Sequence, residues 1–367
     1  MSGLIVHEWL ERHGGAESVV EQFSELYPDA PIFCLWDDYP QRFAGREVKQ
    51  SWLGSTPLRH SKPAALPFMV PTWRRIPQTD VDWILCSSHL FAHHARLLKH
   101  DPGVNKFVYA HTPARYIWNP ELDTRGKSIA VQAAARVLRT IDKKRAAEAT
   151  SIAANSRFVR NRIQETWDMP ASVIYPPVDV AYFSVEDGVS KDLTDSELRI
   201  LENLPDHFLL GASRFVPYKG MNVVIDAGVA ADVPVVLAGD GPELDSLRHQ
   251  ANSVRIPVQI LQSPSRPLLR ALYQRALVFV FPPIEDFGIM PVEAMAAGTP
   301  VIANRAGGAG ESVVDGQSGI LIENFNKTSL SESVSAATGL QPSAPRDRAQ
   351  FFDKSIFRKQ ISEWMKS

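Results

Sequence analysis

The sequence predicts an α/β protein made of two Rossmann-like, doubly wound domains, and three observations support this. The chain has 367 residues, which is long for one core and suits two domains. Short apolar runs alternate with helical patterns, as in βαβ units with right-handed crossovers and parallel sheets. A proline pair at residues 175–179 cannot continue a helix and separates two such series.

Each series supplies its own expected strands and helices. The first-series strands are residues 4–6, 31–35, 83–86, 107–110 and 151–154, and the second-series strands are 208–212, 235–238, 258–261, 277–281 and 301–303. Expected helices cover 15–27, 131–149, 221–229, 243–251 and 266–275. We therefore expect an N-terminal domain over residues 1–178 and a C-terminal domain over 179–352, with a helix at 353–367 returning to the first.

Composition excludes several classes of protein. The formal net charge is −2, so no overall field for collecting nucleic acid is expected. We find no secretory leader and no run of about 18 apolar residues, which predicts a cytoplasmic protein. Cys34 and Cys86 lie in apolar runs and are interpreted as buried thiols, without a disulfide or a zinc site.

The strongest functional signal is the segment 281–300, in which a strand ends at Phe281 and a helix begins near Met290. Such a loop lies at the carboxyl edge of a parallel sheet, where ligands bind. Amide groups at the helix start favour an anion, while carboxylates at Glu285 and Glu293 accept hydrogen bonds from diols. A nucleotide sugar offers both groups, although helix-capping acids would explain the carboxylates equally well.

Other polar turns follow other expected strands. Arg214 and Lys219 lie at a strand-to-helix turn and suit a diphosphate, or are two solvated cations. Glycines at Gly14–Gly15 and at Gly239 allow a ligand to approach the backbone, or are ordinary turns. His111 ends a strand, where a structural histidine is the commoner case.

Together these turns resemble glycosyltransferase family 4, the retaining enzymes of the GT-B fold with two domains facing a central cleft. The resemblance extends from Val6 to about Gly319, and its most specific mark is the pair Glu285 and Glu293 with seven residues between them, with Arg214 and Lys219 upstream. Residues 6–10, 14–17 and 111–118 are similar to bacterial mannosyltransferases that build surface polysaccharides.

The resemblance implies functions for individual residues. It implies a donor site formed by Gly14, Gly15, Arg214, Lys219, Gly239, Ser263, Glu285, Phe287, Gly288, Ile289 and Glu293, and a catalytic set of His111, Arg214, Lys219 and Glu285. It implies GDP-mannose as donor, although residues 261–265 depart from the family pattern and leave a UDP- or dTDP-sugar open. No cofactor and no metal are expected, because cations and a helix start can stabilise the leaving diphosphate.

The acceptor is expected to be a lipid-linked sugar or an oligosaccharide. Residues 51–78 carry four basic side chains, no acid and several apolar ones, which suits an anionic membrane surface or an ordinary basic loop. The candidate acceptor or membrane residues are Arg59, Lys62, Trp73, Arg74, Arg75 and Arg115.

Four classes of function compete for this sequence. A hexosyltransferase is favoured over an epimerase or a phosphorylase, for which no pyridoxal lysine is marked. A dinucleotide oxidoreductase would need Gly-x-Gly-x-x-Gly after the first strand, and residues 13–17 lack it. A sugar-binding protein without catalysis remains the alternative from another class.

Overall fold

The computed structural model describes residues 2–12, 14–77, 80–99, 103–118, 129–185, 189–341 and 343–366. It divides the chain into two compact units, and each is described by itself. Unit 1 comprises Met1–Pro177 with Phe357–Ser367, and unit 2 comprises Val178–Ile356. The passage from one to the other falls within the proline-containing segment 175–179.

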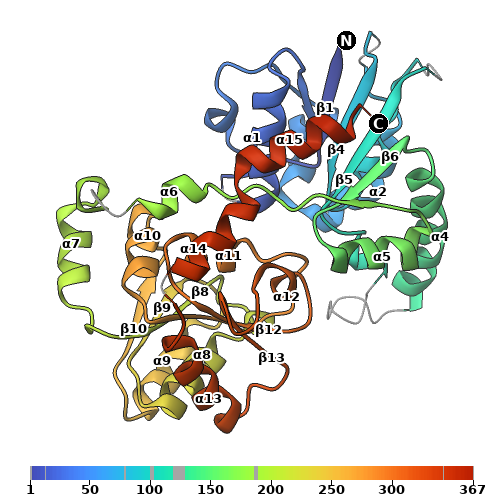
Figure 1. The fold of residues 1–367 in the computed structure, drawn as a ribbon. Helices are drawn as coiled ribbons and strands as arrows, with labels where there is room; N and C mark the ends of the chain where they lie inside the picture. The colour runs from blue at the N-terminus through green and yellow to red at the C-terminus, as the bar shows by residue number, and fades with distance from the viewer. Residues whose placement is uncertain are drawn as a thin grey trace. The chain divides into compact units, whose positions relative to one another are not determined.

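Unit 1 contains a parallel sheet of seven strands in the order β3-β2-β1-β4-β5-β6-β7. Of these, β1, β4, β5 and β6 are labelled in Figure 1. The strands are β1 (Gly3–His7), β2 (Ile32–Cys34), β3 (Val48–Gln50), β4 (Trp83–Ser88), β5 (Asn105–Ala110), β6 (Ser151–Ala154) and β7 (Ser172–Val173). The helices are α1 (Gly15–Leu26), α2 (Lys62–Trp73), α3 (Arg115–Trp118), α4 (Ile129–Ala146) and α5 (Arg157–Trp167). Buried apolar clusters lie on both faces of the sheet, as parallel strands require.

Unit 2 contains a parallel sheet of six strands in the order β10-β9-β8-β11-β12-β13. The strands are β8 (Leu209–Ala212), β9 (Val235–Gly239), β10 (Val258–Gln262), β11 (Val278–Phe281), β12 (Val301–Asn304) and β13 (Gly319–Ile322). The helices are α6 (Val180–Ser184), α7 (Asp195–Glu202), α8 (Met221–Ala231), α9 (Leu244–Ser253), α10 (Arg266–Arg275), α11 (Ile289–Ala296), α12 (Ala309–Ser312), α13 (Lys327–Thr338) and α14 (Ser343–Ala349).

The last helix, α15 (Lys354–Trp364), begins in unit 2 and ends in unit 1. Its residues Phe357, Ile361 and Trp364 are buried in a cluster of unit 1 with Phe23 and Tyr109. The Trp364 indole also donates a hydrogen bond to Ser151 Oγ at 2.8 Å. A C-terminal segment therefore completes the core of the N-terminal unit.

Three strands were not predicted, namely β3, β7 and β13. β3 and β7 are edge strands of three and two residues with exposed or half-buried side chains, so they lack the continuous apolar run that marks a buried strand. β13 reads Gly-Ile-Leu-Ile and alternates between buried and half-buried positions at the other sheet's edge.

Candidate functional site

Two loops meet at the point where the strand order of the second sheet reverses. From β8 the chain proceeds outward to β9 and β10, and it then returns to the other side of β8 with β11. In doubly wound sheets, ligands bind outside the carboxyl ends of the strands at such a switch point. The loop after β8 carries Lys219 and the loop after β11 carries Glu285, and their side chains form an ion pair. Two of the predicted motifs therefore lie together.

A tyrosine links the two predicted cations of this site. Arg214 donates a hydrogen bond through Nη2 to the Tyr218 hydroxyl at 3.0 Å, and Lys219 Nζ lies 5.2 Å from the centre of the Tyr218 ring. Lys219 is 9% exposed, whereas Arg214 is on the surface. Gly220 adopts the left-handed region at φ 62° and ends the turn that holds Lys219 before α8. The ammonium group is thus held at the sheet edge, with a carboxylate as its partner.

The loop that precedes α11 packs closely against the backbone of Gly308. Gly288 turns the chain into α11 with φ 84°. Gly308 donates its N–H to the Glu285 carbonyl at 2.8 Å, and a Cβ on Gly308 would lie 2.2 Å from Phe287 Cα. The Phe287 side chain is buried with its ring centre 5.5 Å from that of Phe352, and contact of the Phe287 backbone with a donor sugar stays a prediction. Gly308 was missed by sequence reasoning, although the glycine-rich run after β12 could have signalled it.

Glu293 lies on α11, where the Tyr273 hydroxyl donates to its Oε2 at 3.3 Å. Burial raises the pKa of Glu293 to about 7, although Arg266 and the Tyr273 hydrogen bond act in the opposite direction. A carboxyl group with such a pKa can lose its proton near pH 7 and then accept hydrogen bonds from hydroxyl groups of a ligand. This half-buried position agrees with a diol-binding role, which stays a prediction.

The raised pKa predicts how Glu293→Gln changes stability with pH. Between about pH 4.5 and 7 the folded protein holds more protons than the unfolded chain, so the contribution of Glu293 to stability falls as pH rises through this window. A glutamine does not titrate. We therefore expect the melting temperature of Glu293→Gln relative to the wild type to increase from pH 4.5 to about 7, as measured by differential scanning calorimetry.

The matched control is Glu332→Gln, because Glu332 is an exposed glutamate on α13. Its melting temperature should differ from that of the wild type by the same amount at every pH. If the melting-temperature difference between Glu293→Gln and the wild type is likewise the same at every pH, the raised pKa of Glu293 is contradicted.

The turns after β9 and β10 lie at the same edge of the second sheet. Ser263 donates its N–H to the Gly239 carbonyl at 3.2 Å, and its hydroxyl donates to the Asp240 carboxylate at 3.4 Å. Gly239 has φ 150°, and a Cβ there would lie 1.8 Å from the Ser213 carbonyl oxygen. Since Ser213 follows β8, backbone contacts join these turns to the loop that carries the cations.

In unit 1, His111 follows β5 at the carboxyl edge of the first sheet. Its Nε2 lies 2.8 Å from Ser87 Oγ, which in turn lies 3.1 Å from His7 Nδ1. Burial, and then the neighbouring His89 and His7, lower the pKa of His111 to about 3, so the imidazole is neutral at pH 7. A neutral imidazole can accept a proton or share a hydrogen bond with a sugar hydroxyl.

The backbone at the start of α1 lies close to the buried carboxylate of Glu17. Gly14 is extended, and a Cβ there would lie 1.9 Å from Glu17 Oε2. Glu17 is 4% exposed and accepts a hydrogen bond from the Glu11 N–H at 3.1 Å. Gly14 therefore brings the backbone close to Glu17, and the contact of Gly14 and Gly15 with a diphosphate stays a prediction.

The basic segment 51–78 differs from the prediction in one residue. Trp73 is fully buried within the unit 1 core, so its assignment to an acceptor or membrane surface was wrong; its apolar neighbours on α2 turn it inward. The exposed aromatic residues of this segment are instead Trp52 and Phe68, which are 53% and 43% exposed with ring centres 5.9 Å apart.

Three predicted cations of unit 1 have acidic partners from other segments. These ion pairs are Arg59 with Asp38 at 2.5 Å, Lys62 with Glu11 at 2.7 Å and Arg74 with Glu148 at 2.6 Å. Arg75 is exposed and Arg115 is half-buried. The segment 51–78 contains no acidic residue, but acidic side chains from other segments of unit 1 pair with three of its cations.

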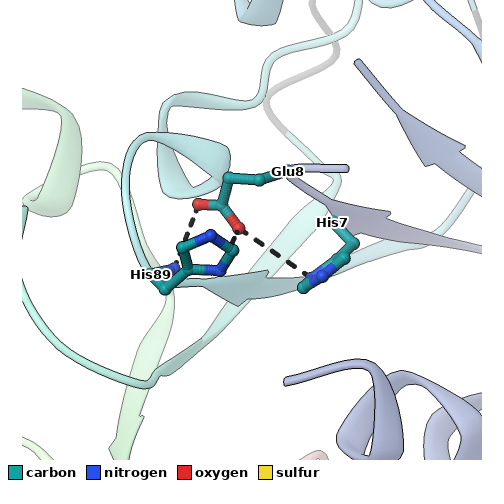
Figure 2. A group of neighbouring side chains, drawn as sticks. All are labelled: His7, Glu8 and His89. Atoms are coloured by element: carbon teal, nitrogen blue, oxygen red, sulfur yellow. Dashed lines mark hydrogen bonds and ion pairs between the residues drawn. The ribbon is translucent and has the colours of Figure 1, made fainter. Parts of the chain in front are cut away.

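Among the described residues of unit 1, two groups of side chains each bring three potential metal ligands within 4.8 Å of one another. They are His7, Glu8 and His89 (Figure 2), and His93, His94 and Asp142. Asp142 already accepts hydrogen bonds from His94 at 2.9 Å and from the Trp118 and Trp167 indoles at 2.7 Å each. The carboxylate of this second group therefore already has three hydrogen-bond donors within the core. The expectation that the protein needs no metal stays a prediction.

Across the described residues, no helix combines the length and apolar character needed to cross a bilayer. Localisation therefore stays a prediction.

Models of glycosyltransferase families match both halves of the chain. The model for glycosyl transferases group 1 matches residues 196–348, and the model for Glycosyltransferase Family 4 matches residues 13–182. The boundary between the two units, at Pro177 and Val178, lies near the end of the Glycosyltransferase Family 4 match.

Individual relatives match about half of the chain. An uncharacterized glycosyltransferase of Methanocaldococcus jannaschii is 32% identical over 49% of this chain and 47% of its own length. A GDP-mannose-dependent alpha-(1-6)-phosphatidylinositol monomannoside mannosyltransferase of Mycolicibacterium smegmatis is 28% identical over 49% of this chain and 50% of its own length. The chain thus covers about half the length of these relatives.

The whole fold matches solved structures. The Anabaena protein HepE, in complex with UDP and glucose, superposes with a TM-score of 0.71 at 21% identity and covers 100% of both chains. This likeness shows the GT-B fold. With a family model matched in each of its two units, the chain belongs to glycosyltransferase family 4.

Proposed function

We propose that this protein is a retaining, metal-independent hexosyltransferase that takes its sugar from a nucleoside diphosphate donor. The observation that carries the proposal is the Lys219–Glu285 ion pair at the switch point of the second sheet. A donor presents a diphosphate that can take Lys219 as its counterion and sugar hydroxyls that can donate to Glu285. The two residues thus neutralise each other until the ligand supplies partners for both.

The proposed reaction breaks the bond between the anomeric carbon and the diphosphate oxygen. Negative charge develops on the departing diphosphate, and Arg214, Lys219 and the amide groups at the start of α11 stabilise it. The acceptor hydroxyl attacks the same face of the sugar, and its proton passes to the leaving phosphate oxygen. Glu285 and Glu293 bind hydroxyls in this scheme and form no covalent bond.

GDP-mannose is the proposed donor, with support from the mycobacterial relative described as GDP-mannose-dependent. The solved complex of HepE with UDP and glucose favours a uridine nucleotide as the second candidate. The residues that would contact the base, Ser263 and the turn at Gly239, lie at the carboxyl ends of β9 and β10.

A panel of nucleotide sugars tests this proposal directly. GDP-mannose, UDP-glucose and a dTDP-sugar are each incubated with the protein, and both the melting temperature and the release of nucleoside diphosphate are measured. We expect one donor to raise the melting temperature and to be consumed. Stabilisation without any release or transfer would favour a sugar-binding protein without catalysis, and no response to any donor would contradict the proposal.

We also propose that the acceptor is lipid-linked and that residues 51–78 rest on an anionic membrane from the cytoplasmic side. Trp52 and Phe68 are exposed aromatic rings in a segment that also carries the exposed Arg75, and aromatic and cationic side chains on one segment suit a bilayer interface. We expect Trp52→Ala combined with Phe68→Ala to lower binding to anionic vesicles by at least about tenfold in a flotation assay.

The control for this prediction is Phe351→Ala, because Phe351 is 63% exposed in unit 2. That variant should float with vesicles as the wild type does. Equal flotation of the double variant and the wild type, or no flotation of either, would remove the membrane from the proposal.

A further inference from the structure

The switch point of the first sheet carries a polar cluster that the donor site does not use. The chain goes outward from β1 to β2 and β3, and it returns on the other side of β1 with β4. The carboxyl ends of β1 and β4 therefore flank a second position where doubly wound sheets bind ligands. His7 ends β1 and is followed by Glu8, and His89 follows β4 (Figure 2).

Glu8 is a fully buried carboxylate with an unusually complete set of donors. Its Oε1 accepts hydrogen bonds from the N–H groups of His89, Leu90 and Ala92 at 3.0, 2.8 and 2.9 Å. Burial alone would raise the pKa of Glu8, but His89, His7 and these amides lower it to about 2. Burying a charge is costly and gives no stability that an apolar side chain could not give. The remaining oxygen, Oε2, therefore needs an explanation.

Oε2 of Glu8 lies between two imidazole rings. It is 3.2 Å from His89 Nδ1 and 3.9 Å from His7 Nδ1 (Figure 2), and neither Oε2 nor His89 Nδ1 makes a hydrogen bond with another described residue. The His89 ring packs edge-on against Trp9 at 4.9 Å between ring centres, and its side chain is 27% exposed. A negative carboxylate this close to Nδ1 favours a proton on that nitrogen over a lone pair, and with the proton there Nε2 is a hydrogen-bond acceptor on the other side of the ring.

His7 has a matching arrangement. Its Nδ1 lies 3.1 Å from the Ser87 carbonyl oxygen, which can only accept, so the proton of His7 is on Nδ1. Its Nε2 is fully buried and has no hydrogen-bond partner among the described residues. The cluster therefore places imidazole nitrogens beside a carboxylate, and of its two histidines His89 is the partly exposed one. Such a set receives hydroxyl donors and repels phosphate or carboxylate groups.

We propose that His89, held by Glu8, binds the hydroxyl group of the acceptor sugar or polyol through Nε2. In this arrangement Glu8 is a positioning residue, and His89 contacts the substrate. The inference rests on the proposed transferase function and names the acceptor class for unit 1: a neutral hydroxyl-bearing group at the β1–β4 switch point.

The test separates transfer from donor consumption. The donor identified by the nucleotide-sugar panel is supplied with octyl α-mannoside, octyl β-glucoside and myo-inositol as acceptor probes. We expect the wild type to glycosylate at least one probe. His89→Ala should lower transfer to it by at least about tenfold through a higher KM for the acceptor, with donor affinity within about twofold of the wild type. His249→Ala, which removes an exposed histidine on α9, should leave both unchanged.

A nitrogen-15 NMR spectrum of the histidine rings tests the role of Glu8. In the wild type the proton of His89 should be on Nδ1. Glu8→Gln places an amide N–H or a carbonyl beside that nitrogen, so we expect the proton to move to Nε2 in a share of the molecules and transfer to fall. If Glu8→Gln does not fold, the kinetics of His89→Ala still test whether His89 binds the acceptor.

Several results would overturn this inference. They are a His89→Ala enzyme that transfers as the wild type does, a wild type that releases nucleotide but glycosylates no probe, and transfer that EDTA abolishes and a divalent cation restores. The last result would make His7, Glu8 and His89 metal ligands instead. A wild type that neither binds nor consumes any donor would contradict the proposed function itself.

Discussion

Replacing Lys219 by alanine is expected to lower kcat/KM for the donor by about 10²-fold or more. The loss follows from geometry, because the Lys219 ammonium meets Glu285 at the switch point where the departing diphosphate would gain its charge. Arg214→Ala should have an effect of the same order, since Arg214 shares Tyr218 with Lys219. Steady-state kinetics with the donor identified by the nucleotide-sugar panel measures both.

The control for these variants is Lys327→Ala, because Lys327 is exposed at the start of α13. It removes the same charge from unit 2 and should leave kcat/KM unchanged. Circular dichroism would show whether Lys219→Ala keeps its fold after Glu285 loses its partner. A folded Lys219→Ala enzyme with turnover close to that of the wild type would refute the assignment of the leaving-group site.

Gly308→Ala is expected to destabilise unit 2 by about 1–3 kcal/mol and to weaken donor binding. The new methyl group would lie 2.2 Å from Phe287 Cα and 2.3 Å from the Asp286 carbonyl oxygen, and both are backbone atoms that cannot rotate away. The loop before α11 would have to move, and with it the amide groups proposed to face the donor. Denaturant unfolding and calorimetric titration of the nucleoside diphosphate measure the two effects.

Gly339→Ala is the matched substitution. Gly339 has φ −86°, and the nearest atom to a Cβ there is the Ala336 carbonyl oxygen at 3.6 Å. Alanine fits this position without strain, so stability and donor binding should remain close to those of the wild type. If Gly308→Ala behaves in the same way, the close packing of the loop before α11 on Gly308 does not matter for the site.

Most of the fold could be predicted because buried parallel strands leave a clear signal in the sequence. β6 and α10 have the predicted bounds, and the other predicted strands differ by one or two residues at an end. β3 and β7 escaped prediction because edge strands need few apolar residues. The burial of Trp73 escaped as well, since α2 is apolar on several sides and its sequence does not show which side faces the core.

Site residues could be predicted where charged side chains directly follow an apolar strand in the sequence. Arg214, Lys219 and Glu285 follow strands that turned out to be neighbours, and the adjacency itself depends on sheet order, which the sequence does not specify. The Glu8–His89 pair was missed because its members are 81 residues apart and neither belongs to a motif with a known spacing. Each of them does follow an apolar strand directly, and that was the available signal.

The central claim is that Lys219, Arg214 and the start of α11 form one binding site for two linked phosphates. Isothermal titration calorimetry of the wild type and Lys219→Ala with GDP and UDP tests it most directly. The account predicts that one nucleoside diphosphate binds the wild type and that Lys219→Ala weakens its binding by at least about tenfold. No heat of binding with either nucleotide, or equal affinity for the two proteins, would contradict it.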